Sequence, residues 1–122
     1  MPRVVHFELA ADDPNRAAKF YTDVFGWQIH KWEGPGDYWL ISTGSSEQPG
    51  IDGGLSRRMM PGDSTTNTID VASLEDAVAK VVESGGTVIE PRIPIAGVGY
   101  VAYCRDTEGN PFSMMQSDPA AA

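Results

Sequence analysis

The stretch His6–Ile29, HFELAADDPNRAAKFYTDVFGWQI, carries most of the information that decides the fold. It begins with residues that favour a β-strand and continues through an acidic turn to Asp13 and Pro14, a carboxylate N-cap followed by proline at the first helical position. Apolar side chains then recur every three or four residues as far as Phe25, which predicts an amphipathic helix that Gly26 ends. The stretch therefore predicts a strand followed by a helix that packs through one face.

Short β-favouring runs, separated by Gly, Pro and Asp turns, follow this helix, and the same order of elements then begins again. The second half has its own predicted helix, which is capped by Ser73 and ends at Gly85–Gly86. The predicted order is strand, helix and three strands, twice. The predicted strands are Val4–Leu9, Trp27–Trp32, Tyr38–Ser42, Ile51–Arg58, Thr66–Val71, Thr87–Ile89, Tyr100–Arg105 and Phe112–Gln116.

The two halves also agree when one is laid on the other. A shift of sixty residues places Asp13 on Ser73 and Gly26 on Gly86, so that helix caps and glycine stops coincide. Because caps and stops have separate physical causes, their agreement at one offset indicates a duplication. We therefore predict an α+β fold of two tandem βαβββ modules within one domain. The predicted parts are a first module at 1–58, a linker at 59–65, a second module at 66–116 and a frayed, exposed tail at 117–122.

Composition and charge restrict the partners of the chain. Its 122 residues suit a single domain, and nine Lys and Arg against seventeen Asp and Glu leave a net charge of −8, which argues against nucleic acid and anionic membranes as partners. Cys104 is the single cysteine, so no internal disulfide is expected. The apolar runs are too short for a membrane span, and acidic residues interrupt the N-terminal region where a signal peptide would be apolar. We expect a cytoplasmic protein with a small-molecule ligand.

Two motifs, the stretch quoted above and DTEGNPFSMMQ at Asp106–Gln116, resemble the vicinal oxygen chelate superfamily. This superfamily includes glyoxalase I, bleomycin-resistance proteins and extradiol dioxygenases. The resemblance covers nearly the whole chain and is closest to uncharacterised glyoxalase-related proteins. It implies that the two modules form a U-shaped, half-open barrel that holds its ligand on the concave face, and that the chain forms a homodimer.

The resemblance also implies where a metal would bind, since the metal enzymes of the superfamily place one ligand on the first strand and one on the last strand of each module. His6 stands at the first of these positions. Thr66 stands at the second, Ser113 replaces the glutamate of the last strand, and Gly53–Ser56 offers no carboxylate or imidazole at the fourth. Hydroxyl groups are poor ligands for divalent ions beside carboxylate and imidazole. We therefore expect neither a glyoxalase-type metal site nor another cofactor.

Three titratable side chains are the candidates for catalysis. His6 and Glu8 are two residues apart on one strand and therefore project from the same face, and Asp70 stands on the corresponding strand of the second module. An imidazole and a carboxylate can divide the roles of general acid and general base. Two alternatives stay open: a partly solvated pair with no chemical role, and a nonstandard metal site of these three residues.

Five further residues are candidates for ligand binding. Thr66 and Thr68 alternate with Asp70 on one strand face, although threonine is also common in strands for its β-propensity alone. Ser113 and Met115 share a face of the last predicted strand, and Tyr100 adds an aromatic ring.

Two functions from different classes fit these residues. The first is a glyoxalase-related protein that binds a small polar or aromatic-containing metabolite and catalyses a metal-independent, lyase-type or isomerase-type proton transfer. The second is a non-catalytic protein that sequesters a small molecule, as bleomycin-resistance proteins do. The excess of acidic residues would favour a cationic ligand in this second case.

Overall fold

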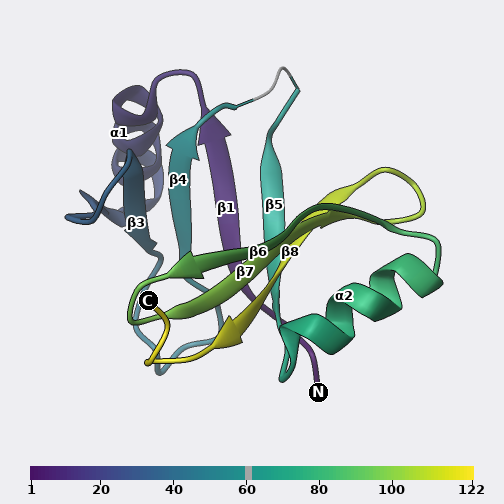
Figure 1. Ribbon diagram of the computed structural model, residues 1–122. Helices are drawn as coiled ribbons and strands as arrows, with labels where there is room; N and C mark the ends of the chain where they lie inside the picture. Colours follow the sequence, from purple (N-terminus) through teal and green to yellow (C-terminus); the bar gives the residue numbers. More distant parts are fainter. Residues whose placement is uncertain (60–61) are drawn as a thin grey trace. The chain divides into compact units, whose positions relative to one another are not determined.

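The computed structural model describes residues 1–59 and 62–122 and contains eight strands and two helices within them. The α+β class and the two βαβββ modules predicted from the sequence are confirmed (Figure 1). Residues 60–61 of the predicted linker lie outside the described residues. The elements are β1 (Val4–Ala11), α1 (Pro14–Phe25), β2 (Gln28–Lys31), β3 (Tyr38–Ser42), β4 (Gly53–Arg57), β5 (Thr65–Asp70), α2 (Leu74–Glu83), β6 (Thr87–Ile95), β7 (Gly99–Arg105) and β8 (Pro111–Ser117).

The chain divides into two compact units, and it passes from one to the other inside β1 and again inside β5. The first-module unit consists of His6–Thr65. The second-module unit consists of Thr66–Ala122 together with the N-terminal segment Met1–Val5, whose Arg3 carbonyl accepts a hydrogen bond from the Asp70 backbone N–H.

In the first-module unit, the strands follow the order β2-β3-β4-β1, with β1 parallel to β4 and the other neighbours antiparallel. The helix α1 contacts β4 and β2. Alternate β1 residues, from Phe7 through Leu9 to Ala11, pack in the core beneath it with the buried side chains of Trp39 and Leu55. Because strand side chains alternate between faces, His6, Glu8 and Ala10 belong to the face turned away from α1.

The helix α1 begins and ends at the residues that the sequence indicates, whereas α2 begins after Ser73 as predicted but ends at Glu83, with Ser84 as its C-cap, before the predicted Gly85–Gly86 stop. The Asp13 carboxylate accepts a hydrogen bond from the Arg16 backbone N–H at 3.1 Å, and Gly26 adopts a φ of 75° at the C-cap of α1. A left-handed conformation of this kind strongly favours glycine. In the second-module unit, the Ser73 hydroxyl accepts from the Asp76 N–H at 3.2 Å at the start of α2.

The second-module unit repeats this arrangement with the strand order β5-β8-β7-β6, in which β5 and β8 are parallel. The helix α2 contacts β6, β7 and β8. Its core consists of the buried side chains of Leu74, Ala102, Cys104 and Met114, with partly buried apolar residues packed around them.

The prediction that the strand after α2 ends at Ile89 is wrong, because β6 continues to Ile95. Pro91 and Pro94 argue for an early end, since proline has no N–H to donate to a sheet. β6 is the edge strand of its unit, and its pairing with β7 shifts register after Val88 and again after Glu90. Edge strands and bulges are the places where a sheet tolerates proline.

The predicted frayed tail is also wrong. β8 extends to Ser117, the Asp118 N–H donates to the Val98 carbonyl, and the Ala121 carbonyl accepts from the Gly97 N–H, both at 2.9 Å. Ala121 is buried. The turn between β6 and β7 therefore holds the last residues in place.

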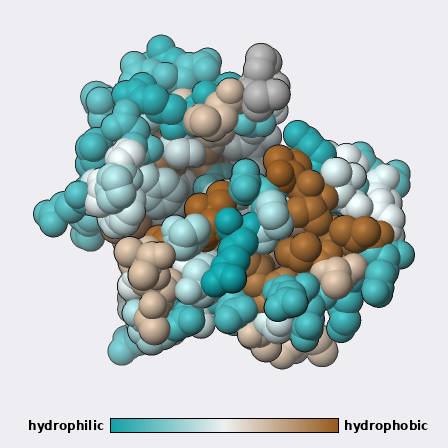
Figure 2. All heavy atoms as spheres, viewed as in Figure 1, coloured by the Kyte–Doolittle hydropathy of each residue, from teal (hydrophilic) through white to brown (hydrophobic). Residues whose placement is uncertain are grey.

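The molecular surface is polar over most of the view in Figure 2, but apolar patches interrupt it in the region of α2 and its neighbouring strands. Val82 and Ile89 of this unit are 60% and 53% exposed. In the other unit, Phe20, Val24 and Phe25 of α1 are more than half exposed. Neither α1 nor α2 is long and apolar enough to cross a membrane, and no other described segment is such a helix.

Candidate functional site

His6 and Tyr38 form a hydrogen-bonded pair in the first-module unit, on the sheet face turned away from α1. His6 Nε2 lies 3.0 Å from the Tyr38 hydroxyl oxygen, and both side chains are partly buried. The topology places β4 between β1 and β3, so the two side chains meet across the intervening strand. Tyr38 is not among the candidates predicted from the sequence, because nothing in the local sequence indicates that β4 alone separates β3 from β1.

A glycine on β4 makes this meeting across the strand feasible. Gly54 is the partner of Glu8 in the β1–β4 register and of Leu40 in the β3–β4 register. A Cβ atom at Gly54 would overlap the hydroxyl and Cζ of Tyr38 and lie 2.8 Å from its Cε1. The phenol ring of Tyr38 therefore lies over the backbone of β4, in the space that a side chain at this position would fill.

The environment of His6 favours the neutral imidazole. Partial burial removes water from the ring and lowers the pKa of His6 below its ordinary value, and the carboxylate of Asp52 opposes this shift to a smaller extent. Glu8, two residues along β1, is partly buried on the same face. A neutral imidazole and a carboxylate therefore lie on one face of one strand, as the sequence predicts.

Trp32 is a second aromatic residue that sequence reasoning did not assign to this face. Its ring meets that of Tyr38 edge to face with 6.3 Å between centroids, and its backbone N–H donates to the Tyr38 carbonyl at 2.7 Å. Edge-to-face pairs of this kind stabilise a fixed ring orientation. The Trp32 indole covers Gly34, where a side chain would overlap it.

The remaining candidates belong to the second-module unit, where Thr68 and Ser113 pair with each other. They are partners in the β5–β8 register, their hydroxyl oxygens are 2.7 Å apart, and both residues are buried. Thr66 is partly buried and Asp70 exposed on the same strand, and Asp70 is the register partner of the partly buried Met115. The structure therefore groups Thr68 with Ser113 and Asp70 with Met115.

Tyr100 lies apart from these residues. It packs against the second-module core beside α2, and the Arg92 guanidinium carbon lies 4.0 Å from its ring centroid. Ser113 is buried on the other face of the sheet, because its neighbours Phe112 and Met114 pack in that same core. Tyr100 and Ser113 therefore do not line one face together, and the role in ligand binding predicted for Tyr100 stays a prediction.

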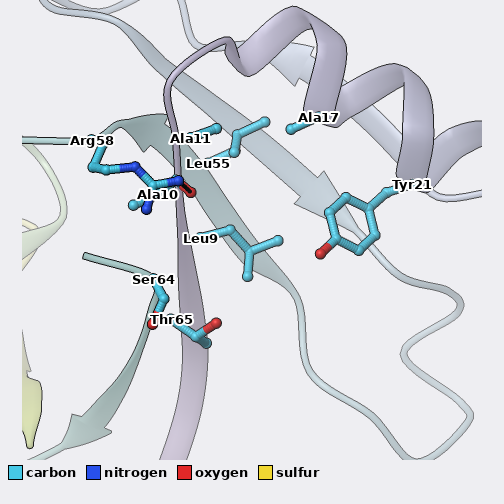
Figure 3. A pocket seen from close by; sticks show the side chains of 9 residues that line it. All are labelled: Leu9, Ala10, Ala11, Ala17, Tyr21, Leu55, Arg58, Ser64 and Thr65. Carbon is cyan, nitrogen blue, oxygen red and sulfur yellow. Dashed lines mark hydrogen bonds between the residues drawn. The ribbon is translucent and has the colours of Figure 1, made fainter. Parts of the chain in front are cut away.

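A cavity of about 310 Å³ lies on the α1 side of the first-module unit (Figure 3). Figure 3 shows Leu9 of β1 and Tyr21 of α1 pointing into the same space. Arg58 lines one side, and its Nε donates to the Asp12 carboxylate at 3.0 Å. Since Leu9 projects from the opposite face of β1 to His6, a molecule held in this cavity would not reach the imidazole. The other lining residues are Ala10, Ala11, Ala17, Leu55, Ser64 and Thr65.

The residues at the superfamily's metal positions do not fit a divalent ion. In the first-module unit, His6 is hydrogen-bonded to the hydroxyl of Tyr38. The ring of Tyr38 also fills the space that a side chain at Gly54 of β4 would occupy. In the second-module unit, the Ser113 hydroxyl is paired with that of Thr68. Within residues 1–59 and 62–122, no three His, Cys, Asp or Glu side chains are gathered closely enough to hold a metal ion. We derive no step that involves one.

The two βαβββ modules and the sequence together define the class of protein. The family model described as Glyoxalase/Bleomycin resistance protein/Dioxygenase superfamily matches residues 3–114, and the chain belongs to this superfamily. The resemblance to the vicinal oxygen chelate superfamily seen in the sequence is thereby confirmed. None of the curated proteins matches the chain.

Solved structures share this fold along nearly the whole chain. A hypothetical protein, BH1468, from Bacillus halodurans C-125 has a TM-score of 0.73 at 15% identity, covering 96% of this chain and 95% of its own. Methylmalonyl-CoA epimerase from Mycobacterium tuberculosis has a TM-score of 0.71 at 12% identity, covering 95% and 88%. A Streptomyces coelicolor methylmalonyl-CoA epimerase variant in complex with 2-nitronate-propionyl-CoA has a TM-score of 0.69 at 14% identity, covering 98% and 97%.

Proposed function

We propose that the chain binds a small polar or aromatic-containing metabolite on the sheet face turned away from α1, and that Glu8 and His6 together catalyse a proton transfer on it, one as the base and the other as the hydrogen-bond donor. The observation that carries this proposal is the partly buried imidazole of His6, held by Tyr38 on the same face as the Glu8 carboxylate. General acid–base catalysis uses two such groups when their environments give them different pKa values, so that one can donate a proton or hydrogen bond and the other can accept a proton. The catalytic role predicted for Asp70, which belongs to the second-module unit, stays a prediction.

The chemistry suits a carbon acid, a molecule with a C–H bond beside a carbonyl group. The base takes the proton of this C–H bond, the electron pair moves onto the carbonyl oxygen to give an enolate, and a hydrogen bond from the acid stabilises the negative oxygen. Return of a proton to the opposite face of the carbon completes an isomerisation. No metal is required if the hydrogen-bond donor is positioned before the reaction begins.

The solved neighbours support the isomerase form of this proposal over the lyase form. Two of those described above are methylmalonyl-CoA epimerases by name, and epimerisation beside a carbonyl is itself a removal and return of one proton. At 14% and 12% identity, these neighbours leave the substrate of this chain open.

Deuterium exchange tests the proposal directly. The probe is 2-indanone, a neutral aromatic ketone with exchangeable C–H bonds, in D2O with a chelator present, followed by proton NMR. We expect wild-type protein to accelerate loss of the C–H signal, and Glu8→Gln or His6→Ala to reduce the acceleration by about 10²-fold or more. Asp118→Asn, in the C-terminal turn, serves as a carboxylate control. Acceleration that survives in both variants would contradict the proposal.

A specific observation also favours sequestration without chemistry. The Trp32–Tyr38 ring pair offers aromatic surface on the same module as Glu8, in a chain with a net charge of −8. Aromatic faces and surrounding negative charge both attract cations. Metal-free bleomycin, which is cationic, is the probe for this function. Saturable binding that is lost in Trp32→Ala, with the compound recovered unchanged after long incubation, would favour sequestration over catalysis.

Homodimerisation and a cytoplasmic location stay predictions. The exposed apolar side chains of α1, among them Phe20 and Phe25, are consistent with self-association. Light scattering at micromolar concentration would measure the mass in solution, and a monomer would exclude the dimer.

A further inference from the structure

The hydrogen bond between His6 and Tyr38 has a direction, and this direction decides which nitrogen of the imidazole carries the proton. Phenol and neutral imidazole can each donate or accept. The imidazole nitrogen is much the better acceptor, since it takes up a proton near pH 6.5, and the phenol is the acidic partner with an ordinary pKa near 10. Between these two groups, the favoured arrangement is the one in which the Tyr38 O–H donates to His6 Nε2.

We propose that Tyr38 is the positioning residue of His6: by donating to Nε2 it fixes the neutral imidazole as the Nδ1–H tautomer, which makes His6 the hydrogen-bond donor to the ligand and leaves Glu8 as the base. This inference rests on the proposed function for its chemical meaning. It goes beyond that function because it assigns the two roles that an imidazole and a carboxylate could otherwise exchange.

This assignment determines how the proton and the electron pair move. Glu8 takes the proton from the C–H bond, the electron pair of that bond moves to the carbonyl oxygen, and the Nδ1–H of His6 donates a hydrogen bond to the oxygen as negative charge develops there. A neutral imidazole suits this task, because it can donate without first losing a proton to water, and partial burial keeps it neutral. Glu8 exchanges this proton with water and then protonates the carbon again, which gives the hydrogen exchange that the 2-indanone experiment measures, whereas inversion at the carbon requires protonation of its opposite face by water.

The hydrogen bond between Tyr38 and His6 also depends on Gly54. Tyr38 reaches Nε2 only by lying over β4, and any Cβ at this position would overlap its hydroxyl. Gly54→Ala should therefore separate Tyr38 from His6 although it changes neither residue. The same geometry explains why a metal-ligating side chain on β4 would have no room beside His6.

Long-range proton–nitrogen NMR of the ligand-free, nitrogen-15-labelled protein measures the tautomer. The exposed His30 is replaced in every sample by His30→Gln, so that a single imidazole remains. We expect the wild-type background to show a protonated Nδ1 and an unprotonated Nε2. Tyr38→Phe, which keeps the ring, and Gly54→Ala should both shift His6 toward the mixture of tautomers of a free imidazole. Ser56→Ala changes a residue on the same strand and face as Gly54, and it should leave the tautomer of His6 as in the wild-type background.

Each outcome bears on the proposal. A protonated Nε2 in the wild-type background, or an Nδ1–H pattern unchanged by Tyr38→Phe, would overturn it. Amide spectra recorded on the same samples show whether each variant is folded, and Tyr38→Phe carries the test if Gly54→Ala unfolds. Because the spectra need no ligand, an Nδ1–H tautomer without 2-indanone exchange would overturn the proposed function and leave the tautomer assignment intact.

Discussion

The hydroxyl oxygens of Thr68 and Ser113 lie 2.7 Å apart, both residues buried, on two parallel strands of the second-module unit. Each hydroxyl forms its hydrogen bond with the other, shielded from water. Each residue therefore depends on the other for the hydrogen bond of its buried hydroxyl. A buried polar group that loses its partner retains the full penalty of its burial.

Removing one hydroxyl is therefore predicted to cost more than removing both. Ser113→Ala should lower the free energy of unfolding by about 1–3 kcal/mol, because it leaves the Thr68 hydroxyl buried without its partner. Adding Thr68→Val, which keeps the shape of the side chain, should restore part of that loss. Urea unfolding of the two single variants and the double variant measures the coupling. Additive effects would mean that the hydroxyl pair contributes nothing as a pair.

Protonation of His6 should destabilise the fold. Its pKa is lowered in the folded chain by burial, so between the folded pKa and about 6.5 the unfolded chain binds more protons. Stability attributed to His6 is thus fully present above pH 6.5 and is lost as the pH falls through the folded pKa. The measurement is the difference in unfolding free energy between wild type and His6→Gln across pH 5 to 8. A difference that does not change with pH would show that the imidazole titrates normally.

Zinc should find no tight site at His6, since Tyr38 holds Nε2 and Gly54 supplies no ligand from the last strand. Calorimetric titration with zinc sulfate is expected to show only weak binding that is the same in wild type and His6→Ala. Stoichiometric, tight binding that disappears in His6→Ala would contradict this and would restore a metal-based mechanism.

The fold was predictable because its signals are local. Asp13 and Ser73 cap the helices, Gly26 ends the first, and the spacing of apolar residues fixes the face that each helix buries. The errors arose where tertiary pairing overrides local preference: β6 runs through two prolines because it is an edge strand, and Ala121 is held by the turn beside Gly97.

The candidate site was predictable only in part, for the same reason. Strand alternation places His6 and Glu8 on one face, and this part of the prediction follows from two residues on one strand. Tyr38 could not be found in this way, because its contact with His6 depends on the order of three strands and on a glycine in the strand between them. The faces of Tyr100 and Ser113 could not be related from the sequence, because the side of the sheet that a residue occupies depends on the register between neighbouring strands.

Amide chemical-shift mapping on adding 2-indanone to the labelled protein shows whether a ligand binds on the His6 face of the first-module unit. We expect saturable changes centred on His6, Glu8 and Tyr38, which Tyr38→Phe reduces and Tyr21→Phe leaves in place. Changes centred instead on Leu9, Ala17 and Tyr21, around the cavity beneath α1, would contradict this expectation.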